Sequence, residues 1–480
     1  MEKISNKKIV AHDGKIVIIG FGSIGQGTLP LILRHVDIPK ENITIIAADE
    51  RGRDVANTLG VNFIINSITA ENHKSILEST LGPGDFLLNL AVDVSSVVLM
   101  KWCRERGVLY LDTSIETWPE QDNDPSLTLS ERSNYWFREE ILELRKTGSK
   151  NDPTAIVCQG ANPGLVSYLL KEALLNIAQD TGHKADIPKT REEWAILARD
   201  LGIKVIHIAE RDTQTSSISK TKDEFVNTWS IDGLHVEACM PAEMGWGTHE
   251  KEFPQDGARH GFGCDSAIYL NQQGYKTSVR SWTPLAGPYI GNVITHNESI
   301  SISDFFTTCE GGELYRPTVY YAYHPCDDAV ISLREVDARV DKLHSKHRLM
   351  REEILPGGVD ELGVLLMGNE KGVYWYGSQL SIDETRTLVP YNNATSLQVT
   401  VSVLAGLIWA LENPTRGILE ADETDHVRML EIMSPYLGNI VGQYSEWTPL
   451  QGRRPEDIPL FNEKNMDLTD PWQFKNFRIS

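Results

Sequence analysis

The fold of this chain is decided by the stretch Lys15-Ile-Val-Ile-Ile-Gly-Phe-Gly-Ser-Ile-Gly25. Four branched apolar residues precede glycines at positions 20, 22 and 25, which have the spacing G-x-G-x-x-G. Gly20 permits a tight turn, Gly22 lets the backbone approach a pyrophosphate, and Gly25 lets the next helix pack closely on the strand. The first turn of that helix offers free N–H groups to an anion. The stretch therefore predicts a strand, a turn and a helix that together bind a dinucleotide.

Short apolar runs alternate with helical patterns on the C-terminal side of this motif. The runs typical of buried strands are at 15–19, 43–48, 61–65, 86–91 and 108–111, with a sixth at 154–159. The patterns typical of helices are at 23–34, 54–59, 73–81 and 96–106. Parallel strands need crossover helices of this kind. We therefore predict an α/β fold in which residues 1–160 form a Rossmann-type, doubly wound parallel sheet.

The pattern and the composition of the sequence change after this region. From 161 to about 385 the alternation is less regular, and aromatic residues, glycines and prolines are frequent. This change indicates a second domain of α+β type. A clean helical pattern follows at 396–411 and is stopped by Asn413-Pro414. We expect residues 386–480 to form C-terminal helices that return to the first domain and an ordered surface tail rich in Pro, Trp and Asp.

The charge balance argues against several classes of partner. Asp and Glu number 67 against 46 Lys and Arg, so the formal charge is −21 and the pI is near 5.1. Such a surface repels phosphate backbones and anionic lipids, so we expect no binding to nucleic acid or to a membrane surface. The longest apolar stretch, 399–411, contains Thr400, Ser402 and Gly406 and is shorter than the ~20 residues of a membrane span. We expect it to be a buried helix.

The N-terminal sequence and the cysteines indicate a cytoplasmic protein. The apolar run after the basic first residues, 16–19, is too short for the core of a signal peptide. The six cysteines are widely scattered and form no C-x-x-C pair, which is typical of reduced thiols. We therefore expect neither a disulfide framework nor a metal site.

Two acids indicate how the dinucleotide is held. Asp49 follows the second predicted strand, where a carboxylate accepts both hydroxyls of the adenosine ribose and repels a 2′-phosphate. This favours NAD over NADP, although Arg51 and Arg53 follow closely and reduce the preference. The alternative is a structural turn followed by a surface acid. Asp93 follows the fourth strand, where it would either contact the nicotinamide or cap the next helix.

Asn162 has two interpretations of the same kind. It lies in Gly160-Ala-Asn-Pro-Gly164, directly after the sixth predicted strand. As a helix cap it would precede Pro163 in the first helical turn. At the end of a sheet strand it would instead face the nicotinamide.

The second domain interleaves carboxylates with one tryptophan: Glu210, Trp229, Glu237 and Glu298. Taken singly, each Glu is more often a solvent-facing residue and Trp229 more often a core residue. An enzyme acting on an amino acid would need an Arg for the substrate carboxylate, whereas these clusters are acidic. A diamine such as putrescine has an ammonium at each end of an apolar stem, which suits carboxylates and an aromatic face.

Five motifs occur together in this chain: G-F-G-S-I-G-Q-G at 20–27, Leu111-Asp-Thr113, Gly160-Ala-Asn-Pro-Gly164, the run 227–237, and Thr295-His-Asn-Glu298. In this combination the sequence resembles the bacterial homospermidine synthase family, over essentially its whole length. That family belongs to a wider saccharopine dehydrogenase-like group with the same dinucleotide domain. The resemblance implies a homodimer that joins two putrescines, or spermidine and putrescine, into sym-homospermidine. Ammonia or diaminopropane would leave, and NAD would be recycled as a prosthetic group.

The resemblance also implies site residues. The active-site positions fall on Glu116, Asn162, Glu210, Trp229, Glu237, His296 and Glu298. Together with the glycine motif, it places the cofactor against Gly20, Gly22, Ser23, Ile24, Gly25, Asp49, Asp93, Thr113 and Asn162. Ser114 and Thr117 flank Glu116 in a loop that departs from the family pattern, in which a proline lies near this acid.

The chemistry implied by the resemblance assigns a role to each group. The substrate ammonium must lose a proton before hydride can leave its carbon, and a Glu of raised pKa, here Glu210, is suited to take it. Asn162 would hold the nitrogen, and His296 or Glu298 would relay protons. Trp229 would stabilise the positive charge that develops on the imine. Glu237 and Glu116 would hold the ammonium at the other end of the diamine.

Two other functions are open on the sequence. A saccharopine or carboxynorspermidine dehydrogenase shares the first domain, but it consumes NAD(P)H stoichiometrically and needs an arginine for the substrate carboxylate. A nucleotide-binding sensor or scaffold would bind the cofactor without turnover. A product analysis with putrescine and NAD distinguishes all three.

Overall fold

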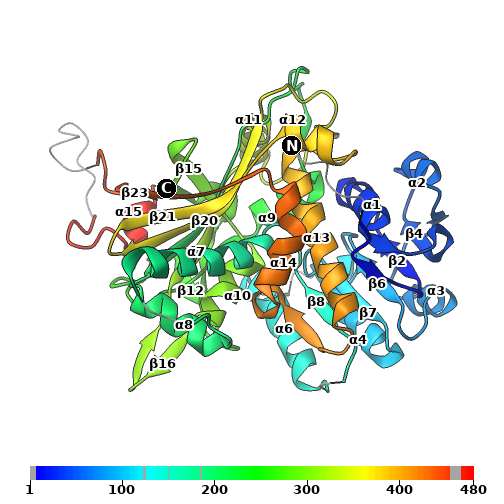
Figure 1. Ribbon diagram of the computed structural model, residues 1–480. Coiled ribbons are helices and arrows are strands. Elements are labelled where there is room, and N and C mark those ends of the chain that lie inside the picture. Colours follow the sequence, from blue (N-terminus) through cyan, green and yellow to red (C-terminus); the bar gives the residue numbers. More distant parts are fainter. Residues whose placement is uncertain (1–6, 123–125, 150, 184–185, 454–465, 480) are drawn as a thin grey trace.

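Two β-sheets from different parts of the chain organise the molecule, and a long helix lies between them (Figure 1). The structure is a computed structural model that describes residues 7–122, 126–149, 151–183, 186–453 and 466–479. The mainly N-terminal sheet lies on the right of Figure 1 and the larger sheet on the left.

The first sheet has seven parallel strands in the order β22-β8-β7-β6-β2-β4-β5. Its strands are β2 (Ile16–Ile19), β4 (Ile43–Ala47), β5 (Asn62–Ile65), β6 (Phe86–Asn89), β7 (Leu109–Asp112), β8 (Ala155–Val157) and β22 (Ile418–Glu420). The helices around it include α1 (Ser23–His35), α2 (Arg53–Leu59), α3 (His73–Thr80), α4 (Ser96–Arg106), α5 (Pro119–Asp122) and α6 (Asn134–Lys146). The predicted Rossmann-type fold class is confirmed.

Hydrophobic side chains fill both faces of this sheet. In β2, Ile16 and Ile18 belong to one core, while Val17 and Ile19 belong to another on the opposite face. Strands covered on both faces have no polar side to show, which is why they are continuous apolar runs in the sequence. The six predicted strands and four predicted helices are present, and most of their ends differ by one or two residues from the expected ones. The seventh strand, β22, was not predicted, because three residues carry too little periodicity.

The second sheet has ten strands and is mixed. Its main order is β12-β13-β11-β18-β9-β20-β21-β23, and β15 attaches β14 to β18. The strands are β9 (Val205–Asp212), β11 (Pro241–Gly245), β12 (Gly257–Arg259), β13 (Ala267–Gln273), β14 (Ser278–Thr283), β15 (Gly287–Ile294), β18 (Thr318–His324), β20 (Val359–Asn369), β21 (Gly372–Ser381) and β23 (Asn439–Ser445). The pair β9 and β18 is parallel, while β20 is antiparallel to β9.

Further helices and two small sheets complete the second half, and a third small sheet belongs to the first half. The helices are α7 (Leu165–Thr181), α8 (Arg191–Asp200), α9 (Ile231–Cys239), α10 (Asn297–Phe305), α11 (Asp327–Ala338) and α12 (Ile382–Leu388). The small sheets pair β1 (Val10–Ala11) with β3 (Val36–Asp37), β10 (Glu224–Asn227) with β19 (Lys346–Leu349), and β16 (Thr308–Glu310) with β17 (Glu313–Tyr315). The predicted second α+β domain is thus present as a mixed sheet with helices.

Helix α13 (Ala394–Glu412) packs against α1 and strands of both sheets. It begins two residues before the predicted start, because the Asn393 side chain accepts a hydrogen bond from the Ser396 N–H and the Ser396 hydroxyl accepts one from the Asn393 N–H. The helix is long and apolar enough to cross a membrane, but 89% of its apolar window is buried inside the protein. The helix is apolar on nearly all sides because it is enclosed between the two sheets.

The segment that we assigned to the first domain, 386–480, is divided between the two halves. Strand β22 joins the first sheet, followed by α14 (His426–Met433), whereas β23 pairs with β21 in the second sheet. The final helix, α15 (Phe474–Phe477), packs on the second sheet through both of its phenylalanines. Residues 454–465 of the expected ordered tail lie outside the described residues.

Candidate active site

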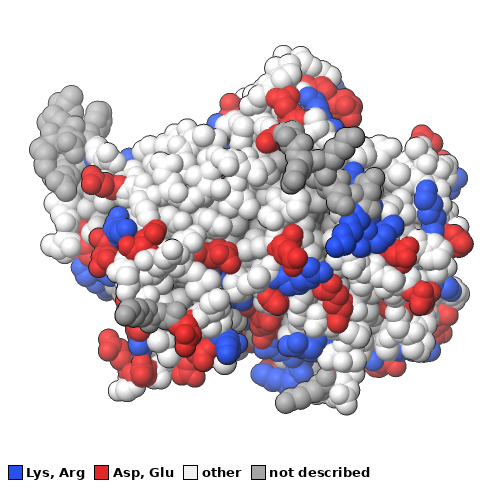
Figure 2. Space-filling view, viewed as in Figure 1, with Lys and Arg blue, Asp and Glu red and all other residues white. Residues whose placement is uncertain are grey.

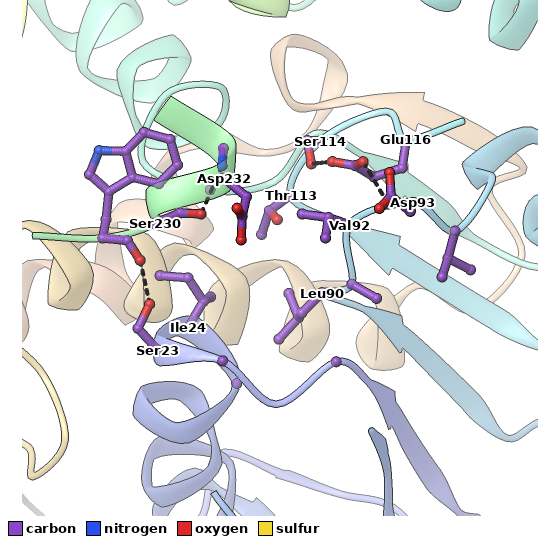
Figure 3. Close-up of a pocket in the computed structure, with 18 of the residues that line it drawn as sticks. Ser23, Ile24, Leu90, Val92, Asp93, Thr113, Ser114, Glu116, Ser230 and Asp232 are labelled. Carbon is purple, nitrogen blue, oxygen red and sulfur yellow. Dashed lines mark hydrogen bonds between the residues drawn. The ribbon is translucent and has the colours of Figure 1, made fainter. Parts of the chain in front are cut away.

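A cavity of about 850 Å³ opens at the carboxyl ends of the parallel strands and extends to the second sheet. Figure 3 shows residues of the glycine loop, the loops after β6 and β7, and the start of α9 facing one space. Every residue that we expected at the site lines this cavity, with one exception. Glu298 is fully buried and lies behind His296.

The glycine loop leaves room for a ligand at the N-terminus of α1. Gly20 has a φ of 83°, and a Cβ there would lie 2.6 Å from the carbonyl oxygen of Leu90. A Cβ at Gly22 would have no protein atom within 4 Å, so this position opens into the cavity. Gly22 is also the N-cap of α1 and provides no side-chain hydrogen bond. The first N–H groups of the helix are therefore available to a phosphate.

Asp49 lies two residues beyond the end of β4, on the cavity wall. Its carboxylate accepts hydrogen bonds from the backbone N–H of Arg51 at 2.8 Å and from the Arg51 Nε at 2.7 Å. These contacts, the backbone one first, hold the pKa of Asp49 below its usual value. Because Arg51 is 87% exposed and pairs with Asp49, it partly offsets the charge that would repel a 2′-phosphate.

Asp93 and Glu116 form a second acidic point on the cavity wall (Figure 3). The Asp93 N–H donates to Oε2 of Glu116 at 3.1 Å, and the Ser114 hydroxyl donates to Oε1 at 2.9 Å. Burial raises the pKa of Glu116 to about 7. The cap interpretation of Asp93 is wrong, since the hydroxyl of Ser95 caps α4. Asp93 therefore does not cap a helix, and it lines the cavity, as Thr113 does.

Asn162 is not a helix cap either. The N-cap of α7 is Gly164, and Pro163 precedes the helix instead of occupying its first turn. The Nδ2 atom of Asn162 is buried and makes no hydrogen bond of normal geometry among the described residues, although the Asn162 side chain interacts with the Tyr321 hydroxyl. A buried amide without a well-formed hydrogen bond is costly, so this donor is available to a ligand in the cavity.

Glu210 lies near the carboxyl end of β9 and is 2% exposed. Its Oε2 accepts a hydrogen bond from the Tyr321 hydroxyl at 2.6 Å. Burial raises the pKa of Glu210 to about 8, against the effect of this hydrogen bond. A carboxyl group that titrates near neutral pH can both accept and return a proton.

Trp229 lies where the two halves of the molecule meet. Its carbonyl oxygen accepts a hydrogen bond from the hydroxyl of Ser23 in the glycine loop (Figure 3). Its indole Nε1 donates to the Tyr323 hydroxyl at 3.3 Å. The preceding Thr228 donates through its hydroxyl to Asp212 at 3.0 Å. The half-buried indole packs partly on the core and also lines the cavity. Trp229 is therefore both a core residue and an aromatic wall of the cavity, the two roles that the sequence left open.

His296 lies between two carboxylates. Its Nε2 is 3.0 Å from Oε2 of Glu237, and its Nδ1 is 3.3 Å from Oε1 of Glu298. Burial disfavours the protonated ring, but the charges of Glu298 and Glu237 outweigh it and raise the pKa of His296 well above its usual value. The site therefore holds an imidazolium between two acids, an arrangement through which a proton can pass.

Comparisons with known proteins show the family to which this chain is similar. Residues 16–156 match the saccharopine dehydrogenase NADP binding domain family, and residues 160–444 match the saccharopine dehydrogenase C-terminal domain family. A homospermidine synthase of Blastochloris viridis is 51% identical over 97% of this chain and 98% of its own. One of Mesorhizobium japonicum is 47% identical over the full length of both.

The chain belongs to the homospermidine synthase family. The solved homospermidine synthase of Legionella pneumophila, in complex with NAD, is 46% identical and superposes with a TM-score of 0.91 over 98% of this chain and 99% of that one. Saccharopine dehydrogenase of Saccharomyces cerevisiae is 10% identical, with a TM-score of 0.50 over 90% of this chain and 100% of that one. The second likeness is one of fold.

The cavity of this homospermidine synthase family member holds its arginines at the nucleotide end. Among the described lining residues these are Arg51 and Arg351. Arg51 pairs with Asp49, and Arg351 donates to the side-chain oxygen of Gln26 in α1 at 3.1 Å. Neither is beside Glu210, where a dehydrogenase for amino acids would need to bind a carboxylate.

Sequence reasoning missed Tyr321 and Tyr323, whose hydroxyls contact Glu210 and Trp229. Both lie in β18, whose aromatic residues are typical of a buried strand. The residue type could have indicated them, because a buried tyrosine needs a hydrogen-bond partner for its hydroxyl, whereas a buried phenylalanine does not.

Proposed function

We propose that this chain is a homospermidine synthase that joins two putrescines into sym-homospermidine with release of ammonia, using NAD. Spermidine would serve as an alternative donor, with release of diaminopropane. The curated relatives that carry this name support the proposal. The observation that carries it is one shared cavity in which a dinucleotide loop meets Trp229 and a set of carboxylates, with no arginine at that end among the described lining residues.

The residues present fit NAD. The open position at Gly22 and the uncapped start of α1 suit a pyrophosphate, and Asp49 suits the adenosine ribose. The buried Nδ2 of Asn162 suits an acceptor on the nicotinamide or on the substrate. We assign the other cofactor contacts to Gly20, Ser23, Ile24, Gly25, Asp93 and Thr113. Bound NAD would accept a hydride from the amine-bearing carbon of the first diamine and return it after the second amine has attacked.

Glu210 takes the proton from the substrate ammonium. A protonated amine has no lone pair to support a positive imine carbon, so this proton must leave first. Burial brings the pKa of Glu210 to about 8, which makes its ionised form a stronger base than an ordinary carboxylate. Asn162 holds the amine nitrogen, and His296 passes protons between Glu298 and Glu237.

Trp229 and the carboxylates stabilise positive charge on the substrate. An indole face attracts a cation without neutralising it, by ~0.5–2 kcal/mol. Glu237 and Glu116 lie on the cavity wall and bind the far ammonium of the diamine. The result is an environment that favours a dication over a zwitterionic amino acid.

We also propose a cytoplasmic homodimer. Figure 2 shows a broad area around β20, β21 and β23 without Lys, Arg, Asp or Glu. Strand β23 ends the strand order of the described sheet, and its Ile440, Val441 and Tyr444 are half-buried. Interface cores are depleted of charge in this way. Analytical ultracentrifugation tests the proposal: a monomer at micromolar concentration would refute it.

The decisive experiment supplies putrescine with much less NAD than substrate. Because the cofactor would be reduced and reoxidised in each cycle, sym-homospermidine should accumulate to many equivalents per NAD. NADH absorbance should not rise in step with product. A reaction that forms one NADH per product would show a dehydrogenase, and NAD binding without any product would show a sensor. Glu210→Gln, which keeps the size of the side chain but removes the base, is the matched control, in which product formation should fall to a slow but measurable residual rate.

A further inference from the structure

Two stacked tyrosines lie behind the two groups to which we assign the chemistry. Tyr321 and Tyr323 are on the same face of β18, with ring centroids 4.8 Å apart and an interplanar angle of 15°. They are 3% and 1% exposed. Strand β18 is paired with β9 in parallel register, so that Tyr323 lies beside Glu210. A pair of rings held on a central strand is a rigid support.

Each hydroxyl of the pair contacts a different functional side chain. The Tyr321 hydroxyl donates to Oε2 of Glu210 at 2.6 Å. The Tyr323 hydroxyl accepts from Nε1 of Trp229 at 3.3 Å. The ring of Tyr321 also lies 4.5 Å from the ring of His296. The hydroxyl of Tyr321 is thus placed at the proton acceptor, while that of Tyr323 is placed at the aromatic wall.

Several charged groups face Glu210 from the surrounding elements. Asp212 on β9, Glu298 on α10 and Asp360 on β20 are acidic, and His296 before α10 is the cation among them. On β18 and β15, Tyr321, Tyr323 and Tyr289 complete the surroundings of the carboxyl group. The three acids disfavour ionisation of Glu210, whereas His296 and the donated O–H of Tyr321 favour it. Among these groups, the ionised form of Glu210 is therefore stabilised only by His296 and by the Tyr321 hydroxyl.

We propose that Tyr321 is the positioning residue of the base: its hydroxyl orients the Glu210 carboxylate toward the substrate amine and stabilises the ionised form. The inference rests on the proposed function, because it assigns Glu210 as the proton acceptor. Tyr321 acts through Glu210 and does not itself exchange a proton with substrate.

The test is Tyr321→Phe, which removes one hydroxyl and keeps the ring. Since a hydrogen bond to a carboxylate lowers its pKa, the acidic limb of the pH profile of kcat for putrescine should move to higher pH by about one unit or more. At pH values below the acidic limb, kcat of the variant should be ~10-fold or more lower than that of the wild type, because less Glu210 is ionised. At pH values above the limb, most of the activity should return. An unmoved limb would overturn the proposal. The position of the limb does not depend on the folded fraction, so a partly unfolded variant still answers the question.

Tyr320→Phe is the matched control. Tyr320 lies on the same strand in a different hydrophobic core, and its hydroxyl has no hydrogen-bond partner among the described residues. This variant should leave the limb in place. In a Glu210→Gln background, Tyr321→Phe should change kcat by less than twofold, because the group it acts through is gone. An effect as large as in the wild type would show a structural role and refute the assignment.

Infrared difference spectroscopy separates this inference from the proposed function. The protonated carboxyl band that disappears in Glu210→Gln identifies Glu210, and its titration needs neither NAD nor turnover. The band should titrate at higher pH in Tyr321→Phe than in the wild type. If the wild type makes no homospermidine while the band still shifts, the proposed function fails and the contact stands. If homospermidine forms and the band does not shift, the positioning role fails alone.

Discussion

Substitution of Trp229 by phenylalanine or alanine separates a cation-binding ring from a core residue. Trp229 is half-buried, and its indole N–H donates to Tyr323 at 3.3 Å. Phenylalanine keeps an aromatic face with a weaker quadrupole, so Trp229→Phe should retain part of the putrescine turnover. A loss of ~0.5–2 kcal/mol of cation–π stabilisation corresponds to a decrease of roughly two- to thirtyfold. Trp229→Ala should lose more, because water enters the space that the ring leaves.

The expected cost in stability is smaller than for a core tryptophan. A fully buried Trp→Ala substitution costs ~3–5 kcal/mol, through lost burial and the cavity left behind. Part of the Trp229 side chain already faces the open cavity, so Trp229→Ala should cost less than this range. Turnover of putrescine and thermal unfolding are measured on the same preparations.

Tyr323→Phe is the control for the indole hydrogen bond, since it removes the acceptor and leaves the indole in place. It should have a smaller effect on turnover than Trp229→Ala. Full activity in a strongly destabilised Trp229→Ala protein would refute the reasoning, because it would show that the ring supports the core and not the substrate.

Two further variants test the cofactor and the charge network. Asp49→Ala should weaken NAD binding by ~1.5–3 kcal/mol and favour NADP relatively, because Arg51 stays while the carboxylate leaves; an unchanged affinity ratio in fluorescence titrations would place Asp49 away from the ribose. Glu298→Gln should lower the pKa of His296, because one of the two charges that raise it is removed; NMR titration of labelled histidine measures the shift. Stability from protonated His296 is fully present below its unfolded pKa of about 6.5 and is lost as pH rises through the higher folded value. A wild-type unfolding free energy that did not fall in this pH window would contradict the ion pairs.

The first half of the chain was the more predictable one. Most of its strands are buried on both faces, and its glycine turn needs a positive φ at Gly20, so both leave a local record in the sequence. Helix α13 was recognisable for the same reason. Strand β22 and the position of β23 were not, because a short strand is defined by its distant partner and not by its own pattern.

Local patterns also left the roles of the polar residues open. Asp93 and Asn162 both had the spacing of helix caps, but Ser95 and Gly164 occupy those positions. A cap is decided by backbone geometry within one or two residues, which is finer than a pattern resolves. Arg51 was a neighbour of Asp49 in sequence, and only the fold shows that it pairs with the carboxylate.

The sequence by itself determined the fold class, the dinucleotide loop and the acidic, tryptophan-containing inventory of the second domain, because each depends on residue type and short spacing. Tertiary structure alone decided that these groups share one cavity, that His296 lies between Glu237 and Glu298, and that Glu210 titrates near neutral pH. The physical reason is that convergence and pKa depend on burial and on partners far away in the chain. The hydrogen bond from Tyr321 to Glu210, which joins residues 111 positions apart on neighbouring strands, is such a contact.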